Sequence, residues 1–212
     1  MAALILDKQQ IRQSFANASQ SYDAMASLQR KVGRELLTKV SLTPDALVLD
    51  IGCGTGFFTE QLKERALLKN IIALDIALPM LLKTQQRLAD NRVALVCADA
   101  EQLPFATQSM DGLVSNLALQ WCLGIEELFA DVQRILRKEG QFVFSTFGSS
   151  ALCELKAAWA EVDDSPHVNE FCHLETLQQK LIAAGFSNIQ LESKTYQRKY
   201  ANVIELMREL KG

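Results

Sequence analysis

The sequence lacks a long hydrophobic run, a basic excess and a cysteine framework, and each absence excludes a class of protein. No apolar stretch in the 212 residues approaches the roughly 20 that a membrane-spanning helix needs. The net charge of -3 leaves no basic excess for a nucleic-acid partner. Five scattered cysteines form neither C-x-x-C pairs nor an even set, which is typical of a reducing compartment. Because the first ten residues also lack the pattern of a signal peptide, we expect a cytoplasmic protein without membrane or nucleic-acid partners.

The composition of the sequence is typical of a single globular domain. Hydrophobic residues make up 49% of the chain and charged residues 22%, and we expect a single domain over 1–212 with room for a sizeable core. Short apolar runs alternate with amphipathic segments. Strands are predicted at 46–52, 70–77, 92–100, 110–119 and 141–147, and helices at 57–66, 79–90, 125–140, 174–186 and 201–212.

This alternation predicts an α/β fold with a doubly wound, mostly parallel sheet. Such sheets bind ligands in a crevice at the carboxyl ends of their strands. Before the first strand, residues 8–40 have apolar side chains at helical spacing and contain no proline, so they are predicted to be helical. After the long helix at 174–186, residues 187–200 have the pattern of one more strand.

Residues 47–58, LVLDIGCGTGFF, are the most informative stretch. The apolar run ends at Asp50, and glycines follow at alternate positions, Gly52, Gly54 and Gly56. A strand that leads into a glycine-rich turn and then a helix lets backbone N–H groups approach a small ligand closely. The spacing D-x-G-x-G-x-G differs from the G-x-G-x-x-G of dinucleotide-binding proteins.

Polar residues also close the next three strands. Asp75 is placed to accept both hydrogens of a ribose diol, Asp99 to accept from the amine of adenine, and Asn116 ends the fourth strand. S-Adenosylmethionine (SAM) has an amine, a sulfonium cation, a ribose and an adenine but no phosphate. Acids at three strand ends therefore favour SAM, with S-adenosylhomocysteine as product, over a nicotinamide dinucleotide.

Given these motifs, the chain resembles the class I SAM-dependent methyltransferases. LDIGCGTGFFTE, LDIALPML and CADAEQLPF are similar to their first three motifs. Three further segments resemble the malonyl-(acyl-carrier protein) O-methyltransferase family of biotin synthesis: SFANASQSYDAMASLQR, LALQWC and HVNEFCHLETLQQKLIAAGF. The resemblance extends from about Lys8 to Gly212.

The resemblance implies that the methyl group of SAM passes to the free carboxylate of a malonyl thioester carried on acyl-carrier protein. It implies a helical lid at 8–40, a SAM-binding core at 45–148 and a substrate-side part at 149–212. Tyr22 in the lid would orient the substrate or cofactor, and Gln120, Trp121 and His167 would lie on the substrate side. The implied cofactor-binding residues are Asp50, Gly52, Cys53, Gly54, Asp75, Ile76, Asp99, Ala100 and Asn116.

Several of these residues also have simpler interpretations. Asp50 and Asn116 are compatible with turn and capping roles, Tyr22 with packing, and Cys53 with a small apolar filler. His167, Cys172 and His173 match no common zinc spacing, so no metal is predicted. The basic cluster Arg30, Lys31 and Arg34, like Arg198 and Lys199, is either a solvated surface or a docking site for the acidic carrier protein.

The chain departs from the family at its end. Family sheets finish with an antiparallel pair of strands, whereas here 187–200 is the last strand-like segment. We therefore expect a sheet without its final strand, a chain shortened at its C-terminus, and an arginine for the malonyl carboxylate outside these residues. The alternatives are a methyltransferase for another small molecule, a non-catalytic SAM-binding module and a nicotinamide oxidoreductase.

Overall fold

The computed structural model describes residues 7–89, 93–163, 165 and 167–211. At its centre lies a five-stranded sheet in the order β3-β2-β1-β4-β5, and its neighbouring strands run parallel. The predicted doubly wound α/β class is confirmed. The strands are β1 (Leu47–Ile51), β2 (Asn70–Asp75), β3 (Val93–Cys97), β4 (Met110–Asn116) and β5 (Leu136–Ser145).

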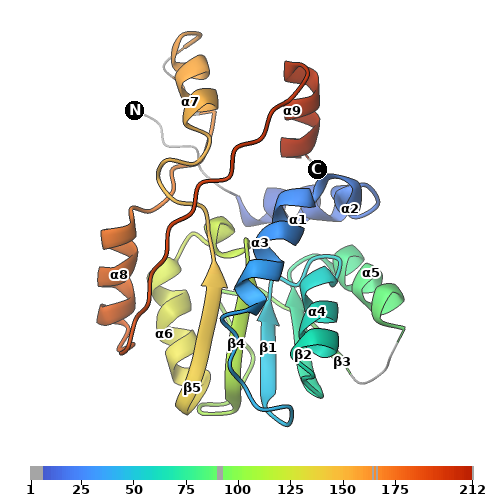
Figure 1. Cartoon of the computed structure of the whole chain (residues 1–212), viewed down its shortest axis with the longest axis vertical. Coiled ribbons are helices and arrows are strands. Elements are labelled where there is room, and N and C mark those ends of the chain that lie inside the picture. Colours follow the sequence, from blue (N-terminus) through green and yellow to red (C-terminus); the bar gives the residue numbers. More distant parts are fainter. Residues whose placement is uncertain (1–6, 90–92, 164, 166, 212) are drawn as a thin grey trace.

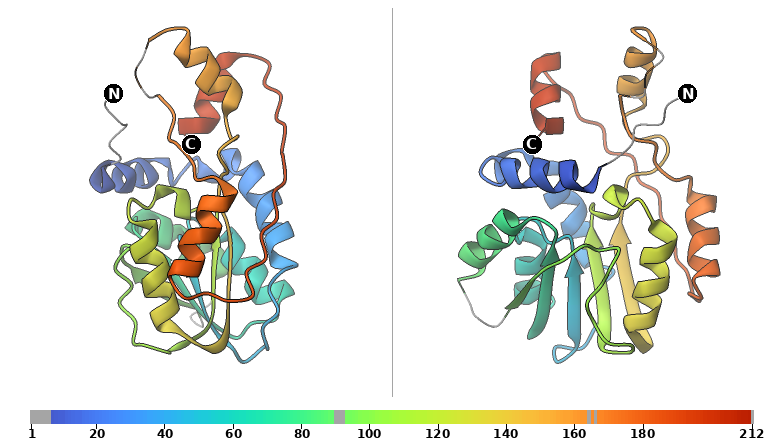
Figure 2. Two further views of the ribbon diagram at one scale, coloured as in Figure 1. Left: turned by 90° about the vertical axis from the view of Figure 1, so that its left-hand side faces the viewer. Right: turned by 180° about the vertical axis from the view of Figure 1, so that it is seen from behind.

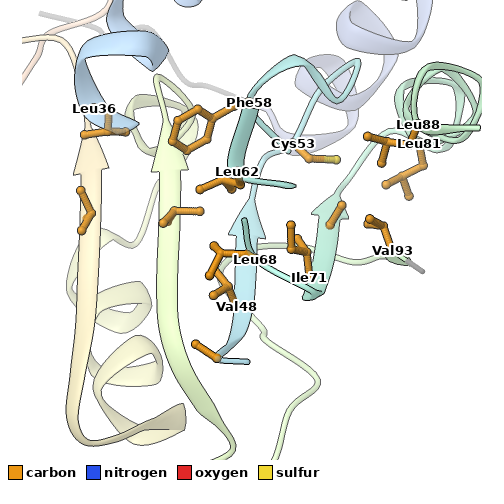
Figure 3. Packing of buried hydrophobic residues seen from close by; sticks show 14 residues of the cluster. Leu36, Val48, Cys53, Phe58, Leu62, Leu68, Ile71, Leu81, Leu88 and Val93 are labelled. Atoms are coloured by element: carbon orange, nitrogen blue, oxygen red, sulfur yellow. The ribbon is translucent and has the colours of Figure 1, made fainter. Parts of the chain in front are cut away.

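Helices cover both faces of this sheet (Figure 1). Alternate residues of β1 supply the two cores: Val48 packs beside α3, α4 and α5, while Leu49 packs beside α6 and α8. Figure 3 shows the first of these cores. The helices are α1 (Lys8–Ala18), α2 (Tyr22–Met25), α3 (Ser27–Leu37), α4 (Phe57–Arg65), α5 (Leu78–Leu88), the 3-10 turn η1 (Leu119–Trp121), α6 (Ile125–Ile135), α7 (Cys153–Ala160), α8 (Leu174–Ala183) and α9 (Val203–Lys211).

The N-terminal helices lie across one end of the sheet. Figure 2 shows α1 above the carboxyl ends of the strands, while α7 and α9 project beyond it. The predicted helical segment at 8–40 is divided because serine hydroxyls bond to backbone carbonyls between α1 and α2: Ser19 donates to Ala16 at 2.8 Å and Ser21 to Ala18 at 3.3 Å.

One helix was predicted too long and another was not predicted. The helix predicted at 125–140 ends at Ile135, because Leu136 turns to extended geometry and pairs with Met110 of β4. A left-handed Glu139, with φ of 63°, then shifts the register before Gln141 pairs with Gly112. Helix α7 is an element that the sequence pattern did not indicate. The predicted ends Asp90, Arg92 and Gly212 lie outside the described residues.

The strand predicted at 187–200 is also wrong: among the described residues, this segment pairs with no strand. It runs antiparallel along α3 instead, visible in Figure 1 as the long red tube before α9. Three side-chain contacts join the two segments: Glu192–Lys39, Lys194–Glu35 and Arg198–Ser27. From one contact to the next, every two residues of the extended segment correspond to four residues of α3 and the turn that follows it. Two extended residues span about 6.6 Å and four helical residues about 6 Å, so the two spacings match.

Within the residues that the structure describes, none of the helices is long and apolar enough to cross a membrane.

Candidate functional site

A cavity opens at the carboxyl ends of β1 to β4, and residues of α1 and α2 also line it. It holds about 750 Å³ of space, counting its opening to solvent. We call it the donor cavity. The predicted site residues that line it are Tyr22, Gly52, Gly54, Asp75, Ile76, Asp99, Ala100, Asn116 and Trp121.

The glycine turn forms the floor of the donor cavity. The N–H groups of Gly52 and Cys53 both donate to the carbonyl of Leu74, at 2.8 and 2.9 Å, which ties the turn to β2. Gly52 has φ of 72°, and a Cβ there would lie 2.3 Å from the Cβ of Ala118. Glycine is therefore required at this position for both backbone conformation and space.

Asp75 is buried where β2 ends, beside the turn. Its two carboxylate oxygens accept from the backbone N–H groups of Gly54, at 2.9 Å, and Ala77, at 2.8 Å. Burial raises the pKa of Asp75, and these backbone hydrogen bonds oppose that rise. Each oxygen keeps a lone pair for a further donor, so a hydroxyl group in the cavity can be bound.

At the end of β3, Asp99 and Ala100 line the other end of the cavity with an unpredicted neighbour, Lys8 of α1. Lys8 Nζ lies 2.5 Å from Asp99 and 2.9 Å from Glu101. Burial lowers the pKa of Lys8, but hydrogen bonds to the two carboxylates outweigh it and the pKa is raised. The contact joins residues 91 positions apart, which is why local sequence patterns did not reveal it.

Asn116 connects the end of β4 to α3. Its side-chain amide donates to the Gln29 carbonyl at 2.9 Å, and its oxygen accepts from Ser145 of β5 at 3.0 Å. The residue thus fixes the N-terminal helices to the sheet at the edge of the cavity.

A smaller cavity adjoins the donor cavity and shares Tyr22, Gly52, Gly54 and Asn116 with it. Asp50 lines this smaller cavity and is 1% exposed. One of its oxygens accepts from Thr59 at 2.7 Å, while Oδ1 has no hydrogen-bond partner among the described residues. Burial raises the pKa of Asp50 to about 7; the hydrogen bond from Thr59 opposes the rise and the charge of Asp75 adds to it.

Three aromatic rings cover the donor cavity. The Phe15 ring lies between Tyr22 and Trp121, with edge-on centroid distances of 6.4 and 5.5 Å. Burial, then the charges of Asp75 and Asp23, raise the pKa of Tyr22 to about 12. Its hydroxyl therefore keeps its proton at neutral pH and can donate a hydrogen bond.

Asp23, next to Tyr22, anchors α2 to the glycine turn. It accepts from the hydroxyl of Thr55 at 2.6 Å and forms an ion pair with Arg87 of α5. Arg87 also donates to the Thr55 carbonyl at 2.8 Å. With Lys8 at the far end, the N-terminal helices are held at both ends of the cavity.

Three further predicted residues lie outside the lining of the donor cavity, although Cys53 is among the residues that line the smaller cavity. The Cys53 thiol packs into the core shown in Figure 3, where burial raises its pKa well above the usual value. Gln120 lies on η1 beside the cavity rather than in its lining, and its amide donates to the Leu117 carbonyl at 2.7 Å. His167 stacks on Trp159, 3.9 Å between ring centroids, outside both cavities. In the described part of the chain, no three His, Cys, Asp or Glu side chains are grouped as a metal site would require.

Comparisons with known proteins agree with this geometry. Residues 49–144 match the family model described as a methyltransferase domain. The malonyl-(acyl-carrier protein) O-methyltransferase of Methylococcus capsulatus is 41% identical over 210 residues, which cover 97% of this chain and 76% of that protein. The protein of the same name from Yersinia pestis is 40% identical over 99% of this chain and 76% of its own length.

A solved structure shows the same fold at lower identity. Phosphoethanolamine N-methyltransferase 2 of Haemonchus contortus, in complex with S-adenosyl-L-methionine, aligns with a TM-score of 0.67 at 21% identity. The alignment covers 84% of this chain and 43% of that one.

Proposed function

This chain belongs to the malonyl-(acyl-carrier protein) O-methyltransferase family, and we propose that it methylates the free carboxylate of a malonyl thioester on acyl-carrier protein, an early step of biotin synthesis. It is an enzyme of the SAM-dependent methyltransferase class. The observation that carries the proposal is the similarity to this family over 97% of the chain, in a protein whose strand-end acids and glycine turn meet in one cavity.

The cavities fit SAM as the methyl donor. SAM supplies an electrophilic methyl group on a sulfonium cation. The residues that would hold it are acceptors: Asp75 for the ribose, Asp99 for the adenine amine, and Asp50, whose buried Oδ1 lacks a partner within the described residues. Ile76 and Ala100 supply apolar lining for the adenine ring. An unpaired buried carboxylate is costly, which supports a ligand donor at this point.

Methyl transfer to a carboxylate requires alignment of the reacting groups and does not require a general base. A malonyl carboxylate is ionised at neutral pH and is already nucleophilic. Alignment of reacting groups can lower a barrier by roughly 7–11 kcal/mol. We assign this alignment to the lid formed by residues 8–40, whose Phe15 and Tyr22 cover the cavity. Because Tyr22 stays protonated, its hydroxyl orients the bound groups by donating a hydrogen bond.

A basic ridge, formed by α3 at the end of the lid and by residues 187–200, supports docking of acyl-carrier protein. The ridge consists of exposed cations on α3 and the 187–200 segment: Lys31, Arg34, Lys194, Arg198 and Lys199. Lys31 and Lys194 lie over the same Tyr196 ring, at 5.1 and 5.4 Å, so the two elements bring their charges together. A carrier protein with an acidic surface would meet this ridge in a transient, salt-sensitive encounter.

The direct test is methyl-ester formation. The protein is incubated with methyl-labelled SAM and malonyl-acyl-carrier protein, and free malonate and other small carboxylic acids are offered in parallel. We expect an alkali-labile methyl ester on the carrier protein, formed faster than on any free acid. Faster turnover of a free acid would indicate a small-molecule methyltransferase. Binding of SAM without product from any acceptor would indicate a binding module.

A further inference from the structure

The smaller cavity contains a second buried acceptor without a partner, on the lid side. Gln29 of α3 lines it together with Asp50, and the side-chain oxygens Gln29 Oε1 and Asp50 Oδ1 are both buried without a hydrogen-bond partner in the described part of the chain. One oxygen comes from the lid and the other from β1. Two such acceptors in one cavity call for a ligand group with several N–H donors.

Gln29 is already fixed by two contacts. Its backbone carbonyl accepts from Asn116 at 2.9 Å. Its side chain also hydrogen-bonds to the Tyr22 hydroxyl, and this bond lowers the pKa of Tyr22. A donor to the phenolic oxygen has this effect because it stabilises the phenolate, so we infer that the Gln29 amide N–H is the donor. The amide nitrogen of Gln29 thus holds Tyr22, and the amide oxygen remains available as an acceptor.

The chemistry of the cavity selects the ligand group. A primary ammonium has three donors and a positive charge, which suit a carboxylate and an amide oxygen. The two cavities share Gly52 and Gly54 in their linings, so we place in the smaller cavity the amino-acid end of a donor whose adenosine fills the donor cavity.

We propose that Gln29 Oε1, together with Asp50 Oδ1, accepts hydrogen bonds from the α-ammonium group of the methyl donor, which makes Gln29 a lid residue that determines specificity for the donor's amino-acid end. The inference rests on the proposed function. It implies that donor binding and lid position are coupled, because one amide contacts both the ligand and Tyr22.

The test compares two ligands by titration calorimetry. S-Adenosylhomocysteine carries the amino-acid end, and 5′-methylthioadenosine lacks it. We expect the wild-type protein to bind S-adenosylhomocysteine more tightly. Gln29→Met keeps the size of the side chain but removes the acceptor, and should weaken S-adenosylhomocysteine binding about tenfold while changing 5′-methylthioadenosine binding less than twofold.

Two further variants separate this role from a structural one. Gln61→Met removes another buried, unpartnered glutamine oxygen outside both cavities, and should leave both affinities unchanged. Gln29→Glu keeps an acceptor but cannot donate to Tyr22, and should retain most of the preference for S-adenosylhomocysteine. Thermal melts confirm that each variant is folded.

Equal weakening of both ligands by Gln29→Met, or none, would overturn the inference, as would loss of the preference in Gln29→Glu. If wild-type protein binds neither ligand, the proposed function itself fails.

Discussion

At the scale of single residues, glycines of the turn after β1 have different neighbours. Gly54 and Gly56 both have positive φ, 57° and 81°. A Cβ on Gly56 would lie 2.8 Å from Thr84, inside the protein, whereas the nearest atom to a Cβ on Gly54 is Tyr22 Cε1 at 3.9 Å, at the junction of the two cavities. Packing therefore limits the side chain at Gly56, whereas we predict that a bound ligand limits it at Gly54.

This difference predicts opposite outcomes for two matched variants. Both Gly54→Ala and Gly56→Ala strain the backbone by about 1 kcal/mol. Gly56→Ala adds a clash and should lower the free energy of unfolding further, as measured by urea denaturation. Gly54→Ala should cost little beyond the strain yet weaken S-adenosylhomocysteine binding at least tenfold. Equal affinity losses in the two variants would argue against a ligand at this junction.

Asp50 should cost stability at neutral pH. An acid whose pKa rises from 3.8 unfolded to about 7 folded binds more protons when folded, so its cost is absent below pH 3.8, grows as the pH rises and is complete above pH 7. Asp50→Asn removes that charge. Most of the growth falls between pH 5 and the folded pKa of about 7, so at about 1.4 kcal/mol per pKa unit the stability gained should grow by up to roughly 3 kcal/mol between pH 5 and 8.

Urea denaturation at both pH values measures this change, with the exposed Asp45→Asn as the control for loss of a charge. A gain that shrinks towards pH 8 would contradict the burial of Asp50. A residue kept at a cost to folding is best explained by binding.

The sequence predicted the polar residues at the strand ends but not their partners. Asp75, Asp99 and Asn116 each end an apolar run, and parallel strands bring such ends to one edge. Their roles in binding stay predictions. Lys8 and Gln29 were missed as site residues because their contacts depend on how the N-terminal helices fold back over the sheet, which no local pattern encodes.

At the scale of elements, α1 and α2 are the part of the proposed lid at 8–40 that lines the donor cavity. Tyr22→Phe removes the donating hydroxyl but keeps the ring against Phe15. We expect turnover on malonyl-acyl-carrier protein to fall about three- to tenfold, the worth of one hydrogen bond, with an unchanged melting temperature. Tyr196→Phe, which loses a hydroxyl bonded to Glu35 outside the cavities, is the matched control. Unchanged kinetics in Tyr22→Phe would remove its orienting role.

The basic ridge makes a prediction about the partner. Lys31→Glu combined with Arg34→Glu should raise KM for malonyl-acyl-carrier protein at least tenfold at low salt, and less at high salt because screening weakens surface charges. Arg30 is left intact because it lines the smaller cavity.

The control pair is Lys69→Glu with Lys138→Glu, at the starts of β2 and β5 and away from the cavity, with the same change of charge. The SAM affinity should stay constant in both pairs. Equal KM effects in the two pairs would mean that net charge, rather than the ridge, governs the encounter.

Element prediction succeeded where burial decides the structure and failed where it does not. The continuous apolar runs of β1, β2 and β4 could be placed from sequence because both of their faces are covered. Residues 187–200 alternate like a strand, but their alternate side chains face α3 rather than a sheet. Alternation of side chains therefore predicts an extended segment but does not predict whether it pairs with a strand or packs on a helix.

At the scale of the whole molecule, the sheet supplies the acids and the glycine turn, and the N-terminal helices close over them. The donor cavity exists because residues 8–22 and 51–122 meet at the carboxyl ends of the strands. We therefore predict that one adenosyl ligand fills this cavity.

Titration calorimetry with SAM and with NADH tests that claim most directly, on the wild-type protein and on Ala100→Trp, whose indole would occupy the cavity. We predict one-site binding of SAM to the wild type, no heat with NADH, and loss of SAM binding in folded Ala100→Trp. Tight NADH binding without a response to SAM, or unchanged SAM affinity in Ala100→Trp, would contradict the account.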